Sequence, residues 1–197
     1  SGEALTQAAL RLADVVPLGG RRMHHLFPPN YMAGVLNCVL LPWVTDGSVV
    51  VGRSFSFETP LQMPLLLGES QSEVAWLSPR MMRSLATVAQ HQDDLRESLQ
   101  RHWRLAVSAT GPLDVATRNA FSNVFQIPVL NTYGTTEHLF ISAETDVIQN
   151  VSCGSLLPHN EIAFGTAPDE NFSKTFVMRQ SGVVWVKTPF MTTLVAD

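Results

Sequence analysis

The heptapeptide Asn131-Thr132-Tyr133-Gly134-Thr135-Thr136-Glu137 is the most informative segment of this 197-residue chain. It joins an aromatic ring, a glycine, hydroxyls and a carboxylate, directly after the apolar run Ile127-Pro128-Val129-Leu130 that predicts a strand. A turn of this composition at the end of a strand can offer a ring face to a planar base, hydroxyls to a phosphate and a carboxylate to a hard cation. The segment therefore predicts a nucleotide-binding turn.

Strand and helix patterns alternate in the part of the chain that leads to this turn. The alternation predicts an α/β fold, with a mostly parallel sheet flanked by helices. The run Ser48-Val49-Val50-Val51 is typical of a buried strand. The predicted strands cover residues 23–27, 48–51, 74–77, 105–107 and 129–132, and the predicted helices cover residues 3–13, 31–41, 58–67, 79–89, 93–100 and 114–125.

The pattern changes after Glu137, because the later strands are separated by turn residues with no helix between them. These strands are predicted at residues 139–143, 161–164, 175–179 and 183–187. They indicate a smaller, antiparallel, β-rich section that is barrel-like. We therefore predict two units, an α/β subdomain over residues 1–143 and a β-rich partial barrel over residues 144–197.

Two helix starts carry clear signals. Asn30, after Pro28-Pro29, is predicted to cap an apolar helix that ends near Pro42. Ser78 is predicted to cap a second helix, with Pro79 at its first position, where the missing N–H costs little.

Three segments fall at the carboxyl ends of predicted parallel strands, where ligands collect in such sheets. They are residues 28–34, 108–113 and 131–137. We expect these three loops to face a common cleft.

Composition restricts the classes of partner. The net charge is −4, the isoelectric point is near 5.8, and no block of Lys and Arg occurs, which argues against nucleic acid and anionic membranes. No apolar run reaches the roughly 20 residues of a membrane span. Charged residues make up only 15% of the chain; either part of an apolar surface is covered by a larger protein, or the chain is an ordinary Leu/Val-rich enzyme. We expect a cytoplasmic protein.

Cysteines and histidines do not indicate a metal site. Cys38 and Cys153 form no Cys-x-x-Cys pair, and we expect both to be buried free thiols. His24 and His25 are adjacent on a predicted strand and so point to opposite faces. A satisfied or exposed histidine pair is favoured over a ligand pair.

Five segments occur in an order that is typical of one superfamily. They are residues 27–34 (Phe-Pro-Pro-Asn-Tyr-Met-Ala-Gly), 108–113 (Ser-Ala-Thr-Gly-Pro-Leu), 133–137 (Tyr-Gly-Thr-Thr-Glu), 154–162 and 182–189. They resemble the Pro-Leu-Phe-His-x-x-Gly segment, the Ser-Gly-Gly-Ala-Pro-Leu loop, the Tyr-Gly-x-Thr-Glu core motif, the glycine-proline turn and the Gly-Glu-Ile-x-Val-x-Gly-Pro strand of the adenylate-forming enzymes. This superfamily contains acyl-CoA synthetases, the adenylation domains of nonribosomal peptide synthetases and firefly luciferase. The chain resembles the central part of their large amino-terminal domain.

The resemblance implies a binding site for ATP or AMP. Tyr133 would stack against adenine, and Asn131 or its backbone would border the base. Thr110 and Gly111 would bring backbone close to the adenosine. Gly134 and Thr135 belong to the same cofactor-binding motif.

The resemblance also implies the reacting groups. Thr136 would bond the α-phosphate and Glu137 would hold Mg²⁺. Tyr31, where many relatives have histidine, would stand between nucleotide and acyl pocket, and Gly34 and Asn37 on the same helix would border the acyl chain. Two alternatives stay open: Tyr133 and Glu137 only close a strand-to-helix turn, and Tyr31 is a core aromatic.

Three departures from the superfamily pattern concern parts that adenylation needs. The loop that wraps the β- and γ-phosphates has no counterpart, the Thr-Gly-Asp segment that binds the ribose is absent, and so is the small carboxyl-terminal domain with its lysine. Asp197 is not assigned the ribose role, and Thr110 replaces a usual glycine. We expect these 197 residues alone not to form an acyl-adenylate.

The favoured interpretation is a fragment of an ATP-dependent carboxylate-activating enzyme, which forms an acyl-adenylate and transfers the acyl group to CoA or a carrier-protein thiol. Its partners would be the rest of the parent enzyme, the acyl substrate, and CoA or a carrier protein. Residues 27–31 and the helix after them favour fatty-acyl or polyketide-starter acids over amino acids. The alternatives are a degenerate, non-catalytic adenylation subdomain that serves as an interaction module in a larger synthase, and a split enzyme completed by a second polypeptide.

Overall fold

The computed structural model describes residues 2–28, 30–146, 152–164 and 184–189. A seven-stranded sheet forms its centre, in the order β2-β1-β3-β4-β5-β6-β7. The first five strands in this order, β2 to β5, are parallel, and β6 and β7 are antiparallel. The strands are β1 (Arg22–His25), β2 (Ser48–Val51), β3 (Val74–Leu77), β4 (Leu105–Ser108), β5 (Val129–Thr135), β6 (Leu139–Ala143) and β7 (Ser155–Leu156). The predicted α/β fold class is confirmed.

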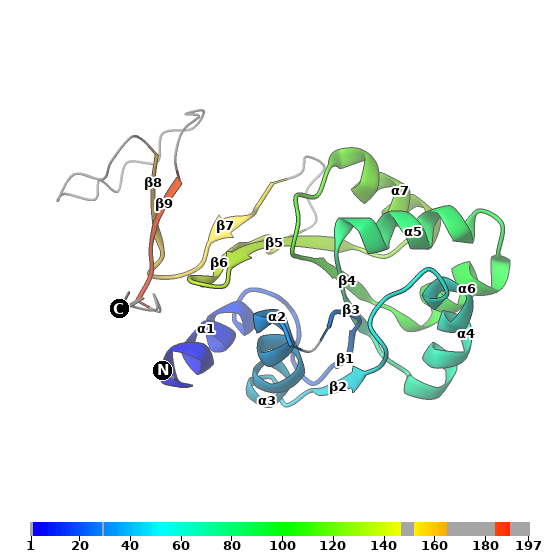
Figure 1. The fold of residues 1–197 in the computed structure, drawn as a ribbon, viewed down its shortest axis with the longest axis horizontal. Coiled ribbons are helices and arrows are strands. Elements are labelled where there is room, and N and C mark those ends of the chain that lie inside the picture. The colour runs from blue at the N-terminus through cyan, green and yellow to red at the C-terminus, as the bar shows by residue number, and fades with distance from the viewer. Residues whose placement is uncertain (1, 29, 147–151, 165–183, 190–197) are drawn as a thin grey trace.

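Helices cover both faces of the sheet (Figure 1). One layer contains α1 (Gly2–Ala13), α2 (Met32–Val35), the π-helix η1 (Leu36–Leu40) and α3 (Leu41–Val44). The other contains α4 (Thr59–Ser70), α5 (Pro79–Ala89), α6 (Asp93–His102) and α7 (Val115–Phe125), which pack against one another. No described helix is long and apolar enough to cross a lipid bilayer.

The alternation of side chains along the strands divides the core in two. On β3, Val74 and Trp76 belong to the core under α1 and η1, whereas Ala75 and Leu77 belong to the core under α4 to α7. All four residues of β3 are fully buried. Such central strands read as continuous apolar runs because helices cover both of their faces.

The predicted strand 48–51 forms, but it is not buried as expected. It is β2, the edge of the sheet, and it pairs only with β1. Ser48 and Val51 are exposed, and the exposed fraction of Val51 is 53%. A run of β-branched residues reports strand propensity but not whether a second neighbour covers the strand.

The predicted helix 31–41 differs from the structure at both ends. Asn30 does not cap it: Tyr31 occupies the cap position with no side-chain hydrogen bond. The helical segment also passes Pro42 and ends at Val44, where the Thr45 hydroxyl donates to the Leu41 carbonyl at 2.6 Å. The wider turn of η1 precedes Pro42, and such a turn loosens the backbone ladder that a proline would otherwise interrupt.

The two helix starts in the other layer have the expected chemistry. Ser78 Oγ accepts a hydrogen bond from the Met81 N–H at 3.3 Å, which confirms the predicted cap of α5. Asp114, predicted as the first residue of its helix, instead caps α7 and accepts from the Thr117 N–H at 2.8 Å. These bonds satisfy backbone donors that a helix start leaves without partners.

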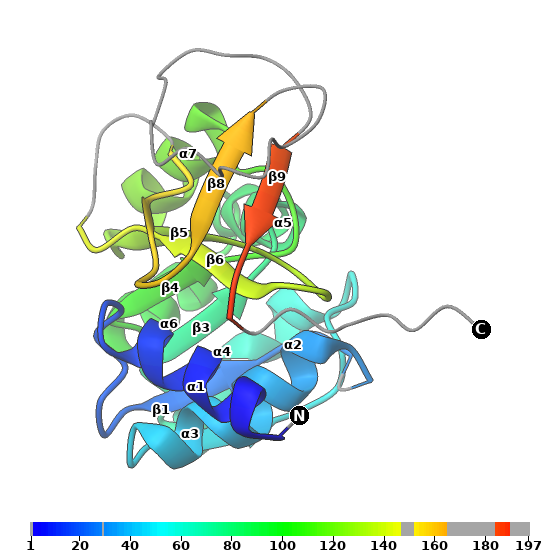
Figure 2. The ribbon, with the colours of Figure 1, turned by 90° about the vertical axis from the view of Figure 1, so that its left-hand side faces the viewer.

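The carboxyl-terminal section contains a two-stranded antiparallel sheet of β8 (Glu161–Phe164) and β9 (Val184–Lys187), which run side by side in Figure 2. The predicted strand at 175–179 and residues 182 and 183 lie outside the described residues. β7 lies beyond residue 143 and extends the main sheet. The division at residue 143 and the partial barrel stay predictions.

Candidate functional site

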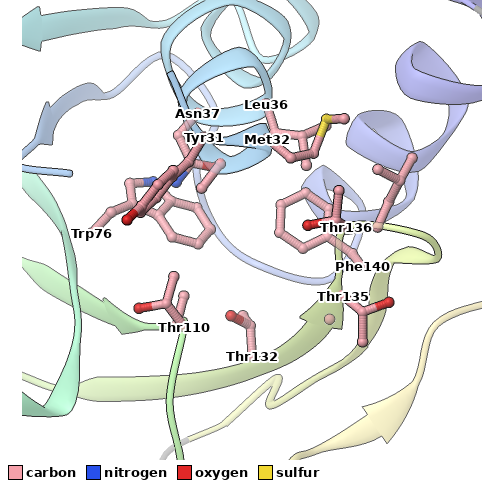
Figure 3. Close-up of a pocket in the computed structure, with 14 residues that line it drawn as sticks. Tyr31, Met32, Leu36, Asn37, Trp76, Thr110, Thr132, Thr135, Thr136 and Phe140 are labelled. Carbon is pink, nitrogen blue, oxygen red and sulfur yellow. The ribbon is translucent and has the colours of Figure 1, made fainter. Parts of the chain in front are cut away.

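The three loops that the sequence singled out meet at one pocket of about 380 Å³, at the carboxyl edge of the parallel strands. Each loop contributes to its wall, although Pro29 lies outside the described residues. Figure 3 shows the side chains around it. The lining residues are Tyr31, Met32, Ala33, Leu36, Asn37, Trp76, Ala109, Thr110, Thr132, Gly134, Thr135, Thr136, Leu139 and Phe140.

The wall of this pocket is largely apolar. The rings of Trp76 and Phe140 lie 6.2 Å apart with an interplanar angle of 33°. Leu36 and Asn37 come from the π-helix η1, a rare turn that often marks functional sites. Among the described residues, no charged side chain lines the pocket.

The heptapeptide continues β5 instead of following it. We expected the strand to end at Thr132, but β5 extends to Thr135 and pairs with β6 as a hairpin, with a bulge between Tyr133 and Gly134. A Cβ on Gly134 would collide with the carbonyl oxygen of Leu139. The strand extends because β6 supplies hydrogen-bond partners, and only a glycine fits where the two strands approach. The turn is thus strand-to-strand, and the alternative of a strand-to-helix turn is wrong.

The strand alternation separates the predicted site residues. Thr132 and Gly134 line the pocket, whereas Tyr133 between them does not, and its exposed fraction is 37%. Gly111 lines a second, shallower depression of about 620 Å³. Thr110 lines both hollows. The site therefore has two sides, which meet at the loop after β4.

Asn131 is buried within β5. Its side-chain amide donates to the Ser152 carbonyl at 2.7 Å, and its exposed fraction is 4%. It does not line the pocket. Its predicted role stays a prediction.

The hairpin turn holds Glu137 at the surface. Thr135 Oγ1 lies 3.0 Å from His138 Nδ1 and accepts from the His138 N–H at 3.2 Å. The N–H of Glu137 itself and then the Thr135 hydroxyl hold the pKa of the Glu137 carboxyl below its usual value. Glu137 is therefore an exposed carboxylate at neutral pH, beside the exposed Thr136.

A buried ion pair supports the start of the heptapeptide. Glu144 Oε2 accepts from Arg118 Nη2 at 2.5 Å and from the Asn131 N–H at 2.8 Å, and both charged side chains are at most 3% exposed. The Glu144 N–H donates in turn to the Asn131 carbonyl at 2.9 Å. This network ties α7 to β5. No local sequence pattern predicts it, because its members are distant along the chain.

The predicted acyl-pocket residues differ in placement. Tyr31 lines the pocket with an exposed fraction of 54%, which excludes a core aromatic. Gly34 is buried in α2 and does not line the pocket, whereas its neighbours Met32 and Ala33 do.

Sequence reasoning missed Trp76 and Phe140 as pocket residues. Trp76 precedes the carboxyl end of β3, and Phe140 follows the hairpin turn. A signal for Trp76 existed, since β3 ends at the same edge as the three loops. Phe140 had none, because its place depends on the pairing of β6 with β5.

The histidine pair takes no part in this site. His24 and His25 are both 1% exposed, and His24 Nδ1 lies 3.2 Å from Ser72 Oγ. Burial, and then the neighbouring His25, lower the pKa of His24 to about 4. No cluster of three or more His, Cys, Asp or Glu in the described part of the chain could hold a metal ion. Cys38 and Cys153 are free thiols, but the predicted burial is wrong: Cys38 is half-buried and Cys153 is exposed.

Comparison with solved structures finds the same fold in larger proteins. MatB from Rhodopseudomonas palustris with ATP bound is 21% identical, with a TM-score of 0.77, and the match covers 97% of this chain and 36% of MatB. A malonyl-CoA ligase with methylmalonyl-CoA and AMP bound is 22% identical, with a TM-score of 0.75 and coverage of 95% and 39%. The anthranilate CoA ligase AuaEII with anthranoyl-AMP is 17% identical, with a TM-score of 0.78 and coverage of 97% and 36%. The chain thus spans less than two fifths of the length of these relatives.

A search of curated protein sequences finds no match. The sequence profile of one family, described as AMP-binding enzyme, matches residues 3–194. That match covers nearly the whole chain and agrees with the resemblance of its five segments. The chain belongs to the family of AMP-binding enzymes.

Proposed function

We propose that this chain forms the acid-binding and nucleotide-binding part of an ATP-dependent carboxylate-activating enzyme. In the proposed reaction a carboxylate oxygen of the acid attacks the α-phosphorus of ATP. The bond from that phosphorus to the oxygen bridging to the β-phosphate breaks, and pyrophosphate leaves. A thiol of CoA or a carrier protein then attacks the acyl carbon, loses its proton, and displaces AMP.

One observation carries the proposal: the loop after β4, the end of β5 with its turn, and the start of α2 with η1 surround one pocket. The pocket supplies an apolar wall for an acyl group, and hydroxyls of Thr135 and Thr136 stand at its hairpin side. Tyr133 does not line this pocket, which we call the acid pocket, so an adenine can stack on its exposed ring without entering the acid pocket. In this proposal the carboxylic acid and the adenine ring lie on opposite sides of β5.

The residue roles follow from this division. Tyr133 stacks on adenine, and the backbone of Asn131, Thr110 and Gly111 borders the adenosine. Thr136 bonds the α-phosphate. On the other side of β5, Tyr31 stands at the mouth of the acid pocket.

The turn offers too few donors to bind Mg²⁺ without a nucleotide, but it fits an Mg²⁺ ion that is also bound by the phosphates of the nucleotide. Glu137 offers one exposed, ionised carboxylate, and no metal-binding cluster lies near it among the described residues. Mg²⁺ commonly binds through one or two carboxylates, with phosphate oxygens and water as its other ligands. Bound there, it would offset negative charge on the phosphates, and Glu137 would hold it.

The acid is a monocarboxylic acid that is neutral apart from its reacting carboxylate. An α-amine or a second carboxylate would enter an apolar pocket that has no charged lining residue in the described part of the chain. Such an unpaired buried charge costs several kcal/mol on an order-of-magnitude scale. This favours fatty-acyl or polyketide-starter acids over amino acids, and also over the malonyl group named for one solved relative, the malonyl-CoA ligase.

Mass spectrometry of acyl-AMP formed by the full-length protein tests the proposal. We expect acyl-AMP with short or medium-length neutral acids, and none with amino acids or malonate. Activation of amino acids only would overturn the acid class. No acyl-AMP with any acid would favour the rival function, a non-catalytic adenylation subdomain in a larger synthase.

The 197-residue chain by itself is expected to be inactive. Each electrostatic contact missing from the transition state costs on the order of 3 kcal/mol, and residues 1–197 contain one plausible Mg²⁺ ligand. Acid-dependent exchange of pyrophosphate into ATP by the purified 197-residue chain would contradict this. Co-purification from the source cell tests whether a second polypeptide completes the enzyme.

A further inference from the structure

Thr110 has a backbone conformation that its residue type disfavours. Its φ is +67°, in the left-handed region, where the branched Cβ of threonine crowds the backbone. Among the described residues, Thr110 is the one β-branched residue with a positive φ. The other non-glycine residues with positive φ are Asp46, Gln71, Gln126, Leu139 and His159.

The position of this strain points to function. Gln71 and Gln126 end helices α4 and α7, where a left-handed residue is usual. Thr110 and Leu139, by contrast, both line the acid pocket. Strained residues persist where the surrounding structure enforces them, and they cluster at binding sites.

Thr110 is placed where its side chain affects the size of the pocket. It lines the acid pocket together with Trp76 and Thr132, and it also lines the second depression together with Gly111. Figure 3 shows its side chain pointing into the acid pocket from the loop after β4. A glycine would adopt φ +67° without strain, but it would remove this part of the wall.

We propose that Thr110 is a specificity-determining residue that limits the length of the acid. Its side chain closes the acid pocket on the side of the β4 loop, so that a longer acid would have to displace it. The inference rests on the proposed function, because it concerns the acid that this pocket binds. The strain is retained because the side chain that causes it shapes the pocket.

Thr110→Gly tests this proposal, because it should raise the thermal stability of the protein and at the same time weaken its discrimination against longer acids. Relief of the strain raises the Tm of the full-length protein, by about 2 °C for a domain of this size. The opened pocket lets longer acids bind. One methylene in an apolar pocket changes kcat/KM by about 10-fold to 200-fold. We therefore expect the kcat/KM ratio of the best acid of the native protein to its homologue two carbons longer to fall at least about 10-fold.

The substrates are the straight-chain acids from butanoate to dodecanoate, assayed by pyrophosphate exchange into ATP. Thr110→Asn separates strain from bulk, because asparagine tolerates the left-handed region and has a similar volume. It should raise Tm and keep the discrimination against longer acids. Gln126→Gly is the matched control: it relieves a left-handed residue at the end of α7, away from both depressions, and should raise Tm without changing the acid profile.

The outcomes separate the two ideas. A lower Tm for Thr110→Gly would contradict the backbone strain that we assign to Thr110. A higher Tm with unchanged relative kcat/KM values for the acids would contradict its role in specificity. A change confined to the KM for ATP would assign Thr110 to the nucleotide side instead and overturn the inference as well. In all three cases acid activation by the native protein would leave the proposed function standing. If the native protein activates no acid, both fail.

Discussion

Glu137 is the residue whose proposed role is easiest to isolate. It is exposed and ionised, so its replacement changes charge at the turn without disturbing the core. If it holds Mg²⁺ at the phosphates, Glu137→Gln should lower the kcat of adenylation about 100-fold, with little change in the KM for the acid. The measurement is acyl-AMP formation by the full-length protein over a range of Mg²⁺ concentrations.

Glu97→Gln is the control for that experiment, because Glu97 is an exposed carboxylate on α6, outside both depressions. An equal loss in both variants would mean that general surface charge, and not a bound ion, supports the reaction. Partial recovery of Glu137→Gln at high Mg²⁺ would strengthen the assignment.

Gly134 is required by the hairpin for a steric reason. A Cβ there would collide with the Leu139 carbonyl on the paired strand. Gly134→Ala should lower the free energy of unfolding by about 3 kcal/mol, the upper end of the usual cost of overpacking, because paired backbones cannot easily separate. Chemical denaturation measures this.

Gly52→Ala is the matched control, since a Cβ at Gly52 would meet no atom within 4 Å. We expect a change of less than about 0.5 kcal/mol for this surface substitution. A Gly134→Ala protein as stable as this control would show that β5 and β6 separate more readily than their pairing implies.

Among the elements, α7 and the β5–β6 hairpin are joined by the Arg118–Glu144 pair. Arg118→Met would leave the Glu144 carboxylate buried without this cation, which typically costs about 3 to 5 kcal/mol. Combining Arg118→Met with Glu144→Gln should recover most of that loss, because the neutral amide oxygen of the new side chain can still accept from the Asn131 N–H. Unfolding free energies of both single variants and the double variant complete the cycle.

Because the Arg118–Glu144 ion pair joins α7 to the β5–β6 hairpin, its loss should also affect function. Asn131 lies in β5, the strand that leads to the turn that we propose binds the nucleotide, so a displaced β5 should raise the KM for ATP more than the KM for the acid. Because the two charged groups are 2.5 Å apart, the stability changes in the cycle should not be additive. Additive changes would contradict the predicted interaction.

At the scale of the whole molecule, the buried histidines make stability depend on pH. The pKa of His24 falls to about 4 from an ordinary value of 6.5, first because of burial and then because of His25, and burial also lowers the pKa of His25. The unfolded chain therefore binds more protons than the folded chain between about pH 6.5 and pH 4. Stability is fully present above about pH 6.5 and is lost as the pH falls through this window.

For His24 the loss is on the order of 3 kcal/mol, from about 1.36 kcal/mol per unit of pKa. Unfolding free energies measured from about pH 7.5 to pH 4 check it. His24→Leu should flatten the dependence, whereas replacement of the exposed His91 by glutamine should not. A native protein equally stable at neutral pH and near the lower end of this window would contradict the burial of both rings.

Several features followed from local sequence. The alternation of strand and helix predicted the parallel sheet, because each buried strand is a short apolar run and each helix has its own period. The Ser78 cap was predicted for the same reason: its chemistry lies within four residues. The convergence of three loops was also predicted, since parallel strands place their carboxyl ends at one edge.

Other features depended on partners that are distant in the chain. The path of the helical segment past Pro42, the exposure of β2 and the extension of β5 depend on neighbouring elements. That Gly134 lines the pocket and Tyr133 does not could be seen only once β5 was paired with β6.

The amino-acid sequence by itself therefore determined the fold class, the family and the loops that form the site, because propensities, caps and motifs act over a few residues. Only the tertiary structure decided how these loops are divided: which side chains line the acid pocket, which do not, and that a strained Thr110 lines both depressions. The physical reason is that strand pairing and side-chain alternation set these directions, and the pairing of β5 with β6 is a contact between strands that the local pattern does not specify.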